Sequence, residues 1–136
     1  MSNQELAKIN YILVCDNLRE EKDSKKFTVL GLYSGTLRLP AFPALMPTLA
    51  FRISIRDVKV GRTMTMSLIR PDGALIGSGE IKIESMGNDR KKAFVNLILA
   101  PFPIETPGLY KLVLTQGKKK STAVAFEAEL MAPKNP

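Results

Sequence analysis

The sequence has no histidine, no tryptophan and a single cysteine, Cys15. Without an imidazole there is no histidine general base and no histidine-based metal site. One thiol cannot form a disulfide within the chain or a cysteine cluster for zinc or iron–sulfur, and it fits a reducing compartment. We therefore expect no catalytic residue, no metal site and no cofactor.

Long apolar runs are also missing. No stretch approaches the roughly 20 residues that a transmembrane helix needs. The polar start of the chain, residues 1–8, lacks the apolar segment and the small-residue cleavage site of a secretion signal. These features predict a cytoplasmic protein with no membrane partner.

The composition that remains is typical of one folded domain. The 136 residues are 45% hydrophobic and 24% charged, with a net charge of +7. A chain of this length can bury a core without disulfides or metals. We predict a single domain over 1–136, with loose tails at 1–8 and 132–136.

Apolar and polar residues alternate along most of the chain, as in half-buried β-strands. The clearest case is the stretch 107–130, in which two alternating runs flank a turn at 117–121 and predict a hairpin. We expect its apolar face to pack on the alternating stretches 48–56 and 62–70. Because turn signals recur at short spacing and no convincing helix is present, the sequence predicts an all-β protein. The expected architecture is an antiparallel β-sandwich of about eight strands, immunoglobulin-like or C2-like.

Two local features add detail to this prediction. Gly31 and Gly35 interrupt the extended stretch 27–39 and predict a bulge or a bend between sheets. Tyr110, two residues after Gly108, begins a strand as the corner tyrosine of immunoglobulin-like domains does, where the hydroxyl bonds to nearby backbone. The alternative for Tyr110 is an ordinary inward-facing aromatic, and both roles are structural.

Strand alternation also divides the loops between two ends of the molecule. If consecutive strands are antiparallel, one end collects the loops 19–26, 57–62, 85–92 and 117–121. Together these loops carry the whole net charge of +7, so we call this the basic end. The other end collects 40–47, 71–73 and 101–107, with seven of the nine prolines. We call it the proline end.

Each end is a candidate binding surface. The basic end could bind phosphates through lysines, with salt-sensitive affinity, or its lysines could simply keep turns soluble. Its candidate anion-binding residues are Lys91, Lys92, Lys118, Lys119 and Lys120. The proline end could bind a protein through stiff apolar loops, or its aromatics could fold inward as lids on the core. Its candidate partner-binding residues are Phe42, Leu45, Met46, Phe102 and Ile104.

Other groups fit a structural role better than a chemical one. Cys15 lies among apolar residues of a predicted strand and is interpreted as a buried thiol. Aspartates at the basic end could hold calcium, but lysines surround them and no Asp-x-Asp spacing occurs. Glu80 and Glu84 share a strand face and could serve as paired carboxylates, although a solvated face is the simpler interpretation.

One stretch of the chain resembles a known family. Residues 15–20, Cys-Asp-Asn-Leu-Arg-Glu, precede the apolar Gly-Leu-Tyr at 31–33 and the Pro-Ala-Leu-Met-Pro loop at 43–47. This order resembles an uncharacterised family of small bacterial proteins. The charged turn at 21–26 departs from the shorter Gly-Lys turn of that pattern. The resemblance implies a bacterial or phage-borne, β-rich cytosolic protein and transfers no functional residue.

Two functions are favoured at this point, and a small enzyme is a third, less favoured class. The first is a non-enzymatic protein-binding or assembly module whose proline end or free sheet edge contacts an unidentified protein partner or another copy of itself. The second is a polyanion- or nucleic-acid-binding protein that acts through the basic end, a class that includes phage-encoded inhibitors of nucleic-acid sites.

Overall fold

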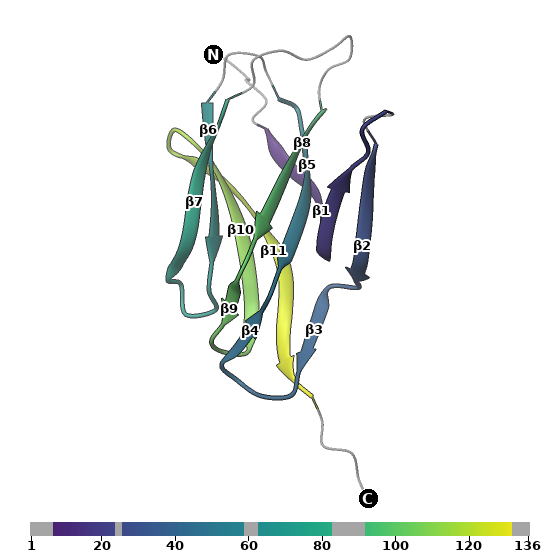
Figure 1. Cartoon of the computed structure of the whole chain (residues 1–136). Helices are drawn as coiled ribbons and strands as arrows, with labels where there is room; N and C mark the ends of the chain where they lie inside the picture. The colour runs from purple at the N-terminus through teal and green to yellow at the C-terminus, as the bar shows by residue number, and fades with distance from the viewer. Residues whose placement is uncertain (1–6, 24–25, 59–62, 83–91, 132–136) are drawn as a thin grey trace, which may run out of the picture.

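A computed structural model of the chain describes residues 7–23, 26–58, 63–82 and 92–131. The described residues form eleven strands and no helix (Figure 1). The strands are β1 (Lys8–Glu20), β2 (Phe27–Tyr33), β3 (Thr36–Leu39), β4 (Ala44–Met46), β5 (Leu49–Arg56), β6 (Thr63–Ile69), β7 (Leu75–Lys82), β8 (Lys92–Leu99), β9 (Phe102–Ile104), β10 (Gly108–Gln116) and β11 (Lys119–Leu130). The all-β prediction is confirmed.

Two main sheets make up the fold. The first has the order β2-β1-β5-β8, and the second has the order β3-β11-β10-β6-β7. All pairs are antiparallel except β3 with β11, which is parallel. The hairpin β10–β11 forms as predicted, and β5 lies in the sheet opposite to it. The expectation for 62–70 was wrong, because β6 pairs with β10 in the same sheet.

The strand count exceeds the expected eight because glycines and prolines divide longer stretches. Gly35, at φ 104°, separates β2 in one sheet from β3 in the other, so the predicted bend between sheets is confirmed. The three-residue strands β4 and β9 form a small sheet of their own within the proline end. Pro103 lies in the middle of β9, which is why the sequence reads there as a loop.

An aromatic cluster fills the space between the two main sheets. The ring of Phe126 stacks on Tyr110 with centroids 4.6 Å apart and on Phe51 at 6.1 Å. Phe102 contacts both Phe51 and Phe126 edge-on. All four side chains are buried, and pairs of this geometry add stability beyond the area they bury.

Both ends of the molecule agree with the predicted grouping of loops. The β1–β2 loop and the β10–β11 turn lie at the upper end in Figure 1, and the β6–β7 turn, β4 and β9 lie at the lower end. The loop residues 59–62 and 85–91 lie outside the described residues. Of the predicted tails, 1–6 and 132–136 also lie outside. Ala7, by contrast, is buried and exchanges two hydrogen bonds with Gln116, while Lys8 begins β1, so neither belongs to a loose tail.

The β1–β2 hairpin folds back over the outer face of the first sheet. Leu13 pairs with Arg52, whereas Phe27 pairs with Glu20, seven residues farther along β1. The Arg52 guanidinium nevertheless lies 4.7 Å from the centroid of the Phe27 ring. A straight β1 would hold these groups far apart, so β1 must bend sharply, as Figure 1 shows.

The bend creates a second, small core. Cys15, Leu18 and Ala50 are buried together, with Val29 packed against them. Gly31 lies opposite Asp16 at φ +67°, where an added Cβ would come within 2.2 Å of the aspartate Oδ2. Glycine is therefore required at this crossing by both conformation and space.

Candidate functional site: a groove between two sheet edges

The apolar residues predicted to bind a partner are mostly part of the core. Phe102 and Ile104 are 1% and 0% exposed, so their assignment as contact residues was wrong. Phe42 and Met46 are half-buried against the same core, and Leu45 is 65% exposed. The pairing of β4 with β9 explains this division, because Met46 opposite Phe102 and Ala44 opposite Ile104 face inward while Leu45 opposite Pro103 faces out.

The lysines predicted to bind anions are only partly placed by the structure. Lys118, Lys119 and Lys120 are exposed around the β10–β11 turn. Lys92 begins β8, but its side chain lies outside the described part of the chain, as does the whole of Lys91.

The most distinctive surface feature is a groove that the sequence did not indicate. It lies between β7, at the edge of the five-stranded sheet, and β8, at the edge of the four-stranded sheet. Within the described residues, neither strand has a hydrogen-bonded partner on its other side. An unpaired edge leaves a row of backbone donors and acceptors available to another strand.

Two glycines on β7 open this groove. Gly77 pairs with Leu68 and Gly79 with Met66, and both of these partners are buried core residues. Since side chains alternate between the faces of a strand, Gly77 and Gly79 occupy core-facing positions. A Cβ added at either glycine would meet no atom within 4 Å. Most strands fill such positions with an apolar side chain, and here the space is left open.

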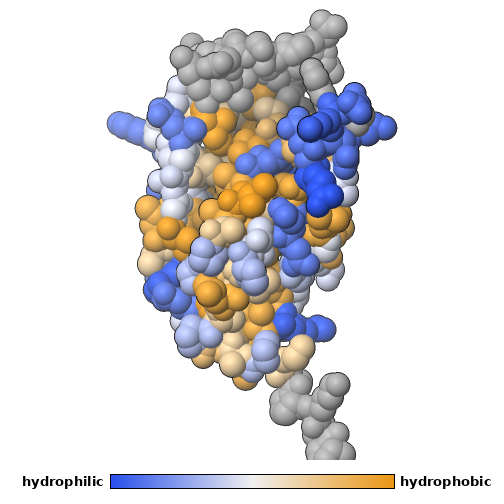
Figure 2. Space-filling model, viewed as in Figure 1, coloured by the Kyte–Doolittle hydropathy of each residue, from blue (hydrophilic) through white to orange (hydrophobic). Residues whose placement is uncertain are grey.

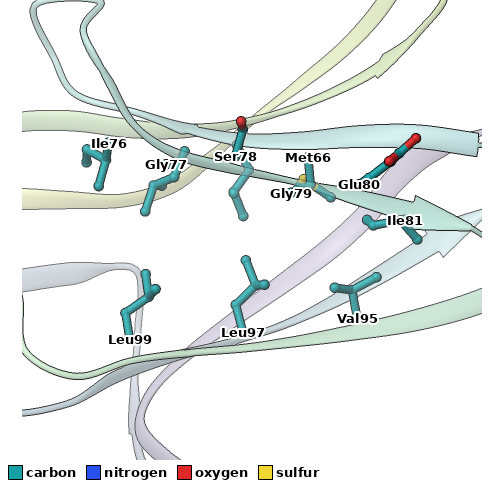
Figure 3. Close-up of a pocket in the computed structure, with 12 residues that line it drawn as sticks. Met66, Ile76, Gly77, Ser78, Gly79, Glu80, Ile81, Val95, Leu97 and Leu99 are labelled. Carbon is teal, nitrogen blue, oxygen red and sulfur yellow. The ribbon is translucent and has the colours of Figure 1, made fainter.

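The opposite wall comes from β8. The side chains of Val95, Leu97 and Leu99 point from β8 toward β7 across the opening (Figure 3). With the buried side chains below them, they enclose a pocket of about 330 Å³ whose lining is mainly apolar. That volume is near the lower limit for small-ligand pockets.

The outer face of β8 is apolar as well. Phe94 is 49% exposed and Ile98 is 52% exposed, and they flank Asn96. Asn96 accepts a 2.9 Å hydrogen bond from Arg52, whose guanidinium lies 4.4 Å from the centre of the Phe94 ring. Figure 2 shows hydrophobic surface along the middle of this view, between polar flanks. An edge strand that is apolar on both faces is a frequent site of strand addition.

No group of three or more aspartate, glutamate or cysteine side chains among the described residues could hold a metal ion. Cys15 is buried, as predicted, and burial raises the pKa of its thiol. Burial, together with a 2.5 Å hydrogen bond to Asp16, raises the pKa of Tyr33 to about 12.

Residues 10–129 match a family described as a family of unknown function, DUF6941. This chain belongs to that family. The resemblance seen in residues 15–47 is thus confirmed, and the match extends over nearly the whole fold. No curated protein matches the chain.

The groove of this DUF6941 protein could not be found by motif. Its only signal in the sequence is the spacing of Gly77 and Gly79, which weakens a predicted strand without saying which face lacks side chains. Among the described residues, none lies in a helix able to cross a membrane.

Proposed function

We propose that this DUF6941 protein is a non-enzymatic protein-binding or assembly module whose contact surface is the groove between β7 and β8. The observation that supports this most is the coincidence of two strand edges, unpaired within the described part of the chain, with an apolar opening between them. Backbone groups along an edge supply affinity, and side-chain pockets beside it supply specificity. The fold that presents the groove is best described as immunoglobulin-like, a proposal supported by the corner bond of Tyr110. The buried, reduced Cys15 is consistent with a cytoplasmic location.

The proposal is tested by closing the groove from inside. Gly79→Leu places a side chain in the opening, whereas Ser78→Leu places the same side chain on the opposite face of the same strand, since Ser78 points away from the pocket (Figure 3). The tagged full chain and both variants are used to capture proteins from the cells that produce it. We expect one protein in stoichiometric amount with the wild type and Ser78→Leu, and its loss with Gly79→Leu. Equal capture by all three would contradict the proposal.

A second candidate function is polyanion or nucleic-acid binding at the β10–β11 turn. It is supported by the exposure of Lys118, Lys119 and Lys120 beside one another and by the net charge of +7. No aromatic residue occurs in that turn, so base stacking does not contribute there. The groove therefore remains the better-supported site.

A further inference from the structure

We propose that the groove receives an extended segment of a partner protein, which adds to the edge of β8 that no other described strand pairs with, and which is mainly apolar with acidic residues at one end. This inference depends on the proposed protein-binding function and specifies its partner.

The glycine spacing matches the side-chain period of a strand. Gly77 and Gly79 leave space at two successive core-facing positions, and alternate residues of an added strand point to the same face with the same repeat. A segment that pairs with β8 therefore directs every second side chain toward the opening. Large aliphatic residues at those positions would fill the space that β7 leaves.

The exposed face of β8 accounts for the remaining side chains of the segment. Phe94 and Ile98 lie two residues on either side of Asn96 on the outer face and are about half exposed. The outward residues of an added strand would lie beside them, as cross-strand neighbours do. Because both faces of β8 are apolar, the segment that fits is apolar on both faces, unlike an ordinary solvent-exposed edge strand.

Charge fixes the orientation of this segment. β7 ends and β8 begins at the basic end of the molecule, where the exposed Arg56 pairs with Lys92. At the other end of the groove, β7 begins at Leu75 and β8 ends at Leu99. Glu80 pairs with Thr65 on the outer face of its sheet. Acidic residues on the partner would therefore complement the end at which Arg56 lies.

A second copy of this chain fits less well. Pairing β8 with β8 of another copy would bring together two molecules of net charge +7, and charge of one sign opposes association.

A random dodecapeptide library displayed on phage tests the inference directly. The library is selected on the immobilised full chain after removal of peptides that bind Gly79→Leu. We expect enriched peptides with a run of apolar, β-forming residues and aspartate or glutamate at one end. Absence of enrichment, or enrichment of sequences without that pattern, would overturn the inference.

The strongest peptide is then labelled for fluorescence anisotropy and hydrogen exchange. We expect binding about tenfold weaker to Gly79→Leu and unchanged to Ser78→Leu. Replacing the acidic residues of the peptide by lysine should also weaken binding about tenfold, and bound peptide should protect the amides of β8. Protection confined to other strands, or a dimer of the free chain that Gly79→Leu abolishes, would contradict the inference. If the library fails while protein capture still depends on Gly79, the proposed function stands and only this inference falls.

Discussion

The hydroxyl of Tyr110 donates a 2.7 Å hydrogen bond to the carbonyl oxygen of Thr106, four residues earlier. The ring is fully buried against Phe126, so this bond fixes the entry of β10 into the core. The corner hydrogen bond that the sequence suggested is therefore present. The ring also faces inward, so Tyr110 fills both of the structural roles considered for it.

Removing this bond should cost a measurable amount of stability. Tyr110→Phe keeps the ring and loses only the hydroxyl, so the free energy of unfolding should fall by about 1 kcal/mol. Urea denaturation should show a lower midpoint with an unchanged slope. Tyr11→Phe, at a side chain that is 43% exposed, is the matched control and should change little. Equal effects at the two positions would show that the Thr106 bond contributes nothing specific.

Phe102 provides a second test, because it was first interpreted as a contact residue. Phe102→Ala should lower the free energy of unfolding by about 3–5 kcal/mol, since it removes a ring packed between Phe51 and Phe126. Leu45→Ala, on the neighbouring strand, should change it by less than about 0.5 kcal/mol because Leu45 is 65% exposed. Thermal and urea unfolding measure both values. A change in the free energy of unfolding as small as that at Leu45 would indicate that the Phe102 ring is exposed and available to a partner.

The sequence predicts the strands well because a period of two is a local property of each stretch. The burial of Phe102 was missed for the opposite reason, since it depends on β4 pairing with β9 more than fifty residues away. The groove was missed for a related reason. The face on which Gly77 and Gly79 lie follows from the register of β7 with β6, and the wall they face comes from β8. Neither relationship is encoded in the strand itself.

The same substitution at two glycines should have opposite effects. At Gly79 the backbone does not have positive φ and nothing lies within 4 Å of an added Cβ. Gly79→Ala should therefore raise the free energy of unfolding by about 0.4–1 kcal/mol, because it restricts the unfolded chain. At Gly31, where φ is +67° and Asp16 lies in the way, Gly31→Ala should destabilise the fold. Melting temperatures of the two variants check both signs, and a destabilised Gly79→Ala would mean that the groove is not open.

Asp72 should titrate well below other carboxyls. Its hydrogen bond with Arg70, followed by one from the Ala74 amide, lowers the pKa of Asp72 from 3.8 to about 2. A lowered pKa stabilises the fold above the unfolded value, and this contribution is lost as the pH falls from about 4 through about 2. Carboxyl carbon NMR measures the titration, and Arg70→Gln should move the pKa back toward 3.8. An unchanged pKa in that variant would assign the shift to another group.

The basic turn allows the second candidate function to be rejected or retained. If Lys118, Lys119 and Lys120 contact phosphates, replacing all three by serine should weaken binding to labelled DNA and RNA at low salt. It should also reduce the slope of log affinity against log salt concentration by about 2 to 3, because each phosphate contact accounts for the release of about one counterion on binding. Fluorescence anisotropy measures both quantities. The control replaces Arg38, Arg70 and Lys111 by serine, which removes the same charge outside the basic end. An equal loss in the control would mean that net charge alone attracts the nucleic acid, and no binding by the wild type would leave the groove as the remaining candidate site.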